Sequence, residues 1–130
     1  MPEPSAQSER DSLTESVIGL AIEVHRALVP GLLESAYQEC LCYELKTNGI
    51  AFARQVALPV AYKAVKLDCG YRMDLVVDDR LVVELKTVEK ILPIHEAQLL
   101  TYLRLSEIRT GLLLNFNTAV LKNGIKRMVL

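Results

Sequence analysis

The 130 residues carry a formal net charge of −1; 51% of them are hydrophobic and 24% are charged. This length and composition predict one globular domain with its own hydrophobic core. They exclude a strongly basic nucleic-acid-binding chain, and no apolar run approaches the roughly 20 residues of a membrane-spanning helix. The first twelve residues contain no apolar stretch typical of a secretory signal, so the cytoplasm is the expected compartment.

Residues 1–11 are polar and are expected to be disordered or loosely ordered, and residues 12–130 are expected to form the single domain. The three cysteines are Cys40, Cys42 and Cys69. An odd number without a CxxC pair argues against a disulfide framework and against a complete zinc site. We expect all three to be small core residues.

Two helices are expected to open the domain. The sequence SLTE at residues 12–15 has the spacing of a capping box, and apolar residues then recur at helical intervals, which predicts a first helix over about 13–28. After a Pro-Gly pair, a second helix begins at Leu32 or Leu33 and stops at the Asn-Gly pair at 48–49.

Three polar side chains on these helices have both a functional and a structural interpretation. His25 could be a proton carrier or site contact, but near a last helical turn it is more often a favourable charge. Glu34 lies in a first turn, where the helix dipole favours an anion. Tyr37 lies one turn further on the same face and suits packing as well as chemistry.

The stretch YRMDLVVDDRLVVELKT at residues 71–87 predicts an antiparallel hairpin, because apolar strand formers flank a polar Asp-Asp-Arg turn. A three-residue turn pairs Val77 with Leu81 and therefore sets Asp74 directly opposite Glu84. Side chains alternate between the faces of a strand, so Lys86 shares the face of Glu84.

Directly opposed carboxylates, with Cβ atoms about 4.5–5.5 Å apart, repel each other unless a cation or proton lies between them. Asp74 and Glu84 on one rigid hairpin could bind a hard divalent ion together, and Lys86 could then orient or deprotonate an attacking water. The alternative is that Glu84 and Lys86 form the solvated face of an edge strand. The continuous apolar run at 81–83, typical of a strand buried on both faces, favours the metal site.

The remaining elements complete a mixed sheet flanked by helices, in the order ααβββαββ. A strand is expected over 56–62, with a turn at 63–66 before the apolar alternation that leads into the hairpin. Pro93 opens a third helix, on which Gln98 and Tyr102 are four residues apart and project together. A buried strand at 111–116 should run parallel to the Glu84 strand, and residues 120–130 suit a closing hairpin or edge strand.

The order αβββαβ, with Asp74, Glu84-Leu85-Lys86 and Gln98-x-x-x-Tyr102, resembles the PD-(D/E)XK nuclease superfamily. The segment GLLESAY at 31–37 looks like the signature of the bacterial GxxExxY protein family, and the phrases LPVxYK, VELK, HxAQLLxYL and GLLxNF add to that likeness. The resemblance implies an α/β fold with a mixed sheet, a restriction-endonuclease-like αβββαβ core and an extra N-terminal helix. The chain departs from the family pattern at Val29 and Asn117, where glycine is expected, and at Met73, where the superfamily name has proline.

The same resemblance implies a nuclease that depends on Mg²⁺ or Mn²⁺. Glu34, Asp74 and Glu84 would hold the ion with help from the backbone carbonyl of Leu85, and Lys86 would serve the attacking water. Gln98 and Tyr102 would orient the site or touch the nucleic acid backbone, and Tyr37 and His25 complete the candidates for substrate binding or site orientation.

The implied substrate is DNA, with RNA as the alternative. A chain this close to neutral has little electrostatic attraction for duplex phosphates, which fits a homodimer or a nuclease that receives its substrate from a protein partner. The competing hypothesis is a catalytically silent nucleic-acid-binding or dimeric assembly module on the same fold.

Overall fold

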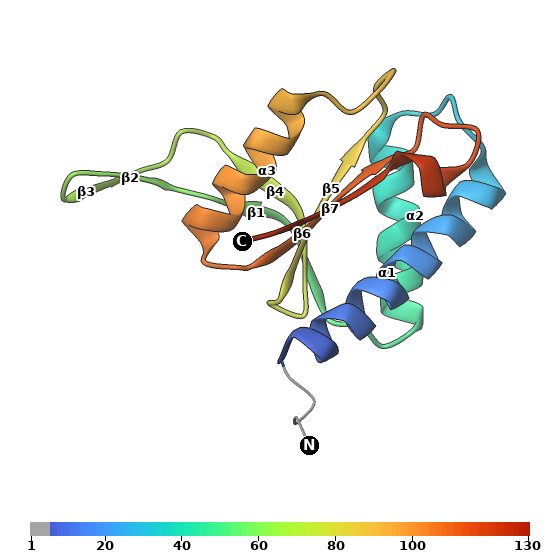
Figure 1. Ribbon diagram of the computed structural model, residues 1–130, viewed down its shortest axis with the longest axis horizontal. Coiled ribbons are helices and arrows are strands. Elements are labelled where there is room, and N and C mark those ends of the chain that lie inside the picture. The colour runs from blue at the N-terminus through green and yellow to red at the C-terminus, as the bar shows by residue number, and fades with distance from the viewer. Residues whose placement is uncertain (1–5) are drawn as a thin grey trace.

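The computed structural model describes residues 6–130, with side chains from Ser12 onward. A five-stranded mixed sheet lies between two helical layers, with α1 and α2 on one face and α3 on the other (Figure 1). This is the expected α/β architecture: an αβββαβ core, built from α2, β1, β4, β5, α3 and β6, with α1 as an additional N-terminal helix.

The helices, in chain order, are α1 (Ala6–Leu28), α2 (Glu34–Thr47), α3 (Pro93–Ser106) and the 3₁₀ helix η1 (Leu121–Gly124). The main sheet has the order β1-β4-β5-β6-β7 and contains β1 (Phe52–Ala57), β4 (Arg72–Val77), β5 (Leu81–Lys86), β6 (Thr110–Asn115) and β7 (Ile125–Val129). A separate two-stranded sheet consists of β2 (Val60–Tyr62) and β3 (Val65–Leu67).

The pairing of the main sheet agrees with the sequence-based expectations. Val77 pairs with Leu81 across the β4–β5 hairpin, whose turn residues Asp78 and Asp79 have φ angles of 51° and 55°. Asp tolerates this left-handed conformation better than most residues, which is why the turn closes there. Strands β5 and β6 are parallel and joined through α3, and β7 is an antiparallel edge strand.

Both faces of the sheet centre are buried, because each has its own hydrophobic cluster. One cluster joins α1 and α2 to the sheet and includes Leu41, Leu85 and Phe116. The other joins α3 to the opposite face and includes Val82 and Leu99. This double cover accounts for the apolar runs at 81–83 in β5 and at 111–114 in β6.

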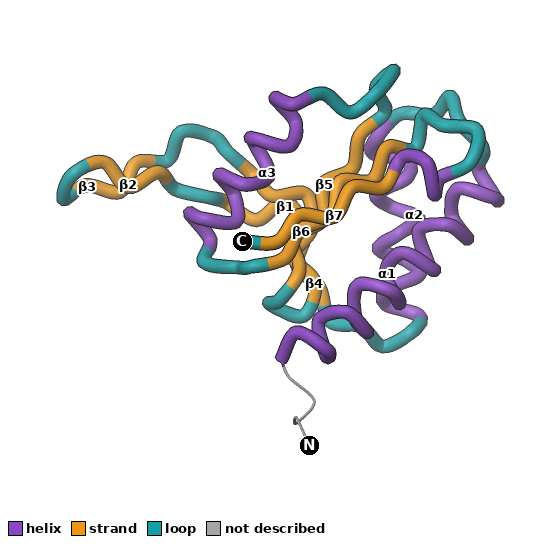
Figure 2. Tube along the Cα trace, in the orientation of Figure 1, coloured by secondary structure: helices purple, strands orange, loops and turns teal. Residues whose placement is uncertain are grey.

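The expected single strand over 56–62 was wrong in its extent. Strand β1 begins at Phe52, and the chain leaves the main sheet at Leu58-Pro59 before β2 and β3 continue as a projecting arm (Figure 2). Proline has no N–H to donate to a ladder, which favours the break. The expected turn at 63–66 is shorter, since Tyr62 already pairs with Val65.

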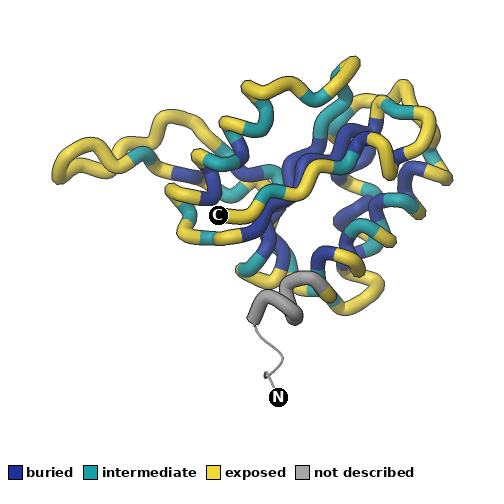
Figure 3. Tube along the Cα trace, viewed as in Figure 1, coloured by how far each residue is buried: buried dark blue, intermediate teal, exposed yellow. Residues whose placement is uncertain are grey.

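The alternating apolar side chains from Leu67 to Val77 were expected to lie on one buried face. Only those in the second half of this segment are buried. Leu67 and Tyr71 are exposed, whereas Met73 and Val77 are buried. The arm extends beyond the helices that cover the sheet, so its apolar side chains meet solvent (Figure 3). Cys69 is exposed as well, which contradicts its expected place in the core, while Cys42 is buried as expected.

The N-terminal helix is longer than expected. Helix α1 begins at Ala6, so the SLTE sequence lies inside it and is not a cap; Ser16 Oγ donates to the backbone oxygen of Ser12 within the helix at 3.1 Å. The S-x-x-E spacing was misleading because strong helix formers precede it. Residues 1–5 lie outside the described residues, and the division of the chain at residue 11 stays a prediction.

In the part of the chain that the structure describes, no helix is both long and apolar enough to cross a membrane.

Candidate active site

The two acids of the central hairpin face each other where the β4–β5 ladder ends. Backbone pairing runs from Val77–Leu81 to Leu75–Val83. At the next step, the Asp74 N–H donates to Glu84 Oε2 at 2.7 Å, and the Leu85 N–H donates to Asp74 Oδ2 at 2.9 Å. Beyond the last backbone pair, each carboxylate therefore accepts a hydrogen bond from the backbone of the opposite strand.

Glu84 is only 5% exposed although it is a carboxylic acid. Burial, followed by the negative charges of Asp74 and Glu34, raises its pKa to about 8, against the lowering effect of the Asp74 N–H and of Lys86. Its ionised form is thus costly without a nearby cation. This is the electrostatic situation that a bound metal ion relieves.

Glu34 reaches the same end of the sheet from a different element. It is the first residue of α2, where the helix dipole favours a carboxylate. Burial and then Asp74 raise the pKa of Glu34, while Lys86 at the end of β5 lowers it. Such charge effects weaken with distance, so Glu34 lies within electrostatic range of Asp74 and Lys86.

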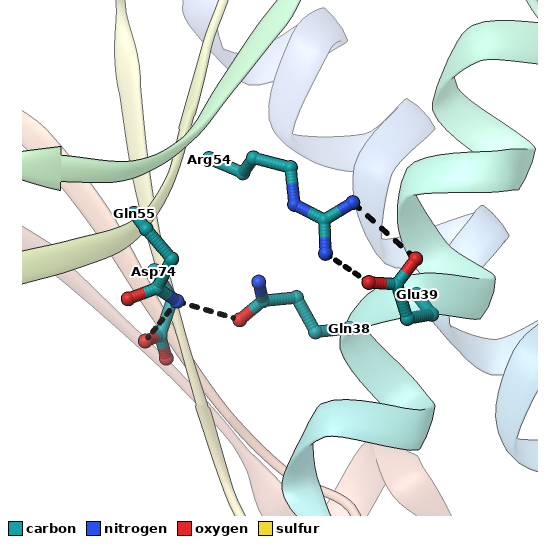
Figure 4. Close-up of polar contacts among 5 residues, drawn as sticks. All are labelled: Gln38, Glu39, Arg54, Gln55 and Asp74. Atoms are coloured by element: carbon teal, nitrogen blue, oxygen red, sulfur yellow. Dashed lines mark hydrogen bonds and ion pairs between the residues drawn. The ribbon is translucent and has the colours of Figure 1, made fainter.

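Two glutamines that sequence analysis missed connect α2 to Asp74 (Figure 4). Gln55 on β1 donates through Nε2 to Gln38 Oε1 at 3.0 Å and to Asp74 Oδ1 at 3.4 Å. Gln38 is four residues after Glu34, so helical spacing could have placed it on the site face. Nothing in the local pattern indicated Gln55, whose φ of 49° is unusual outside glycine. The neighbouring Arg54–Glu39 ion pair is exposed.

Helix α3 adds a hydrogen-bonded pair from the other layer. Gln98 Nε2 donates to the Tyr102 hydroxyl at 3.1 Å. Burial raises the pKa of Tyr102, and Glu84 and Asp74 raise it further. Tyr102 therefore lies within electrostatic range of the two carboxylates, and Gln98 is hydrogen-bonded to it.

Tyr37 acts on the loop before Glu34. It is fully buried; its hydroxyl donates to the Val29 backbone oxygen at 2.5 Å and accepts from the Leu32 N–H at 3.2 Å. Its ring stacks on Phe116 with centroids 4.5 Å apart. Tyr37 thus suits the orienting role considered from the sequence.

His25 is placed by contacts with the loop after β6. It is 5% exposed, and its Nε2 hydrogen-bonds to the Thr118 backbone oxygen at 2.7 Å. The carbonyl can only accept, so Nε2 carries the proton. Among the described residues, the contacts of His25 are with Thr118 and Phe116 and not with the acids.

The donor chemistry of the site fits a divalent metal, although the side chains are not arranged as a finished metal centre. Among the described residues, no group of three or more His, Cys, Asp or Glu side chains is close enough to hold an ion. Asp74 and Glu84 each use one oxygen on a backbone N–H. The hard oxygen donors of Glu34, Asp74 and Glu84 are nevertheless of the type that Mg²⁺ and Mn²⁺ prefer.

Comparison with known proteins gives a family assignment over most of the chain. The family model described as the PD-(D/E)XK nuclease superfamily matches residues 11–128. Neither the curated proteins nor the solved structures contain a match to the chain.

Proposed function

We propose, since the chain belongs to the PD-(D/E)XK nuclease superfamily, that it is a metal-dependent phosphodiesterase that cleaves DNA, with RNA as the alternative substrate. One observation carries this proposal: Asp74 and Glu84 are held against each other at a sheet end, where burial and Asp74 raise the pKa of Glu84 to about 8. A carboxylate pair this unfavourable without a cation is typical of a functional site.

Glu34, Asp74 and Glu84, with the backbone carbonyl of Leu85, would hold Mg²⁺ or Mn²⁺. The ion supplies Lewis-acid polarisation of the scissile phosphate. Lys86 would orient the water that attacks phosphorus and would offset the negative charge that develops as the phosphorus–oxygen bond breaks.

The side-chain amides of nearby glutamines would orient the residues of the site. Gln55 restrains Asp74 Oδ1 from the β1 side and is itself held by Gln38 on α2. Gln98 fixes the Tyr102 hydroxyl on the α3 side. Helix α2 and strand β1 are thus tied to Asp74 by side-chain hydrogen bonds, whereas the Gln98–Tyr102 hydrogen bond lies within α3.

Metal binding and cleavage test the proposal directly. Calorimetry should detect Mn²⁺ or Mg²⁺ binding to the wild type and none to the Asp74→Ala, Glu84→Ala double variant. A matched control, Glu15→Ala with Glu89→Ala, removes two exposed carboxylates and should bind the ion like the wild type. The same proteins are then assayed on labelled single- and double-stranded DNA. A wild type that neither binds the ion nor cleaves would refute the proposal.

Variants of Gln98 and Tyr102 distinguish a role of these residues in the active site from ordinary packing. If they serve the site, Gln98→Ala and Tyr102→Phe should leave the melting temperature and Mn²⁺ affinity nearly unchanged and lower turnover or nucleic-acid binding by about tenfold, equivalent to about 1.4 kcal/mol. Arg104→Ala, an exposed change on the same helix, is the control and should have no effect. Full activity in both variants would remove this helix face from the site.

The catalytically silent module is the second candidate, and one observation favours it. Asp74 and Glu84 already accept backbone hydrogen bonds, so the hairpin holds them without an ion. Such a module would be dimeric or would bind nucleic acid without turnover. A folded protein that binds an oligonucleotide, but that does not bind the metal ion and does not cleave the oligonucleotide, would support this candidate.

Finer assignments follow the same proposal. Gly31, Glu34 and Tyr37 match the pattern that names the GxxExxY family, and Gly31 has the positive φ of 111° that favours glycine. We place the protein in that family and in the cytoplasm. Its near-neutral charge is consistent with a homodimer or with a partner that delivers the substrate.

A further inference from the structure

A groove of about 580 Å³ lies between the base of the projecting arm and α3. Val60 and Tyr71 contribute one wall, and Ile94, Gln98 and Tyr102 are among the residues of the other. A volume of several hundred Å³ is typical of sites for small organic groups. The groove is thus large enough for a base-sized ligand.

Tyr102 belongs both to the groove and to the electrostatic surroundings of the acids. This residue lines the groove, and Glu84 and Asp74 act electrostatically on its hydroxyl. On the arm side, the ring of Tyr71 lies edge-on to the ring of Tyr102, with centroids 6.2 Å apart, and Tyr71 remains 46% exposed. A group that fills the groove would therefore contact an aromatic ring while a phosphate lies at the acids.

Charge decides what kind of group fits. Of the described residues that line the groove, none carries a carboxylate, an ammonium or a guanidinium group. His95 also lines it, and its Nδ1 accepts a hydrogen bond from the Leu92 N–H at 2.9 Å, so that nitrogen carries no proton and the imidazole is neutral. A phosphate would be left without a counter-charge there, whereas a neutral aromatic ring could stack on Tyr71 and hydrogen-bond to Gln98 or Thr101. This combination of apolar walls and a few polar groups matches a nucleobase.

We propose that this groove is a nucleobase subsite, which receives an unstacked base of the strand whose phosphate lies at Asp74 and Glu84. The inference rests on the proposed function and deepens it by naming the substrate class. A base inside an intact duplex is paired and stacked, so it cannot enter without being extruded. The protein should consequently prefer single-stranded or frayed nucleic acid to an intact duplex.

The test measures binding separately from cleavage. In a Glu84→Gln background with Mg²⁺, which blocks the proposed turnover, fluorescence anisotropy gives Kd for a labelled oligothymidylate and for the corresponding duplex. Tyr71→Ala should raise the Kd for the single strand at least about tenfold, equivalent to about 1.4 kcal/mol. Tyr71→Phe keeps the ring and should stay within about twofold of its parent.

Tyr43→Ala is the matched control, because Tyr43 is 67% exposed on α2 and does not line the groove. Thermal melts establish that each variant is folded. Equal affinities of the Tyr71→Ala and Tyr43→Ala proteins, no binding of the single strand, or tighter binding of the duplex would overturn the subsite. Sedimentation showing that Tyr71→Ala converts a dimer into a monomer would also overturn it, since the groove would then hold a second copy.

Cleavage assays on the chain with Glu84 intact keep the two proposals apart. If the protein binds single strands through Tyr71 and cleaves nothing, this result contradicts the proposed phosphodiesterase activity and supports the subsite. If the protein cleaves DNA, and the Tyr71→Ala and Tyr43→Ala variants have equal activity and equal Kd, the result contradicts the subsite alone.

Discussion

At the scale of single residues, Glu84 couples the candidate site to stability. Its pKa rises from an ordinary value of 4.5 to about 8 because of burial and Asp74. Below pH 4.5, Glu84 is protonated in both the folded and the unfolded state. Between pH 4.5 and about 8, it is protonated only in the folded state. Stability of the metal-free protein should therefore fall as pH rises through this range, by about 1.4 kcal/mol for each pKa unit of difference at most.

Glu84→Gln should remove that pH dependence and stabilise the metal-free fold at the alkaline end, because a neutral amide can still accept the Asp74 N–H. Thermal melts in EDTA across the pH range measure the effect, with the exposed Glu89→Gln as control. A clear loss of stability in the Glu84→Gln protein at alkaline pH would contradict this account.

Val29 carries backbone strain in the loop that Tyr37 holds. Its φ is 56°, a left-handed conformation that costs a β-branched residue about 1–2 kcal/mol, and the family pattern leads one to expect glycine there. Val29→Gly should raise the free energy of unfolding by about 1 kcal/mol in urea titrations, since the side chain is exposed and little burial is lost. Val29→Ala retains Cβ and should gain much less.

At the scale of elements, the close approach of α3 to the sheet depends on Gly111. A Cβ added at this position of β6 would lie 2.9 Å from Leu99 Cδ1. Overpacking of this kind typically costs about 1–3 kcal/mol, so Gly111→Ala should be destabilising in chemical denaturation.

The contact between Gly111 and Leu99 provides an internal control for the destabilisation expected of Gly111→Ala. Leu99→Ala alone should cost about 2–5 kcal/mol through the cavity that it leaves. The double variant should be more stable than the sum of the two losses, because the new methyl group occupies part of that cavity. Strict additivity would mean that the clash is relieved elsewhere.

At the scale of the whole molecule, a net charge of −1 provides little long-range attraction for nucleic acid. Binding in the presence of Mg²⁺ should then depend weakly on monovalent salt, with a slope of log K against log salt that corresponds to about two phosphates. Anisotropy titrations at several KCl concentrations measure this slope. A steep slope, corresponding to about six phosphates or more, would indicate a basic binding surface instead.

Local sequence determined much of the hairpin and identified the strands that are buried. The three-residue turn between Val77 and Leu81 sets the register that puts Asp74 opposite Glu84, and apolar runs identified the strands that are covered on both faces. These features depend on interactions between residues near in sequence, so periodicity and turn chemistry suffice to predict them.

Only the tertiary structure decided which distant residues join the hairpin acids. Helix α2 packs on the sheet, which brings Glu34 within electrostatic range of Asp74 and lets Gln38 hydrogen-bond to Gln55. Gln55 on β1 donates to Asp74 from a backbone conformation that no local pattern indicated. The projecting arm likewise turned an expected buried face outward and left Tyr71 exposed. Burial and contact between elements depend on how the whole chain packs, because a side chain's own sequence neighbours do not determine what covers it.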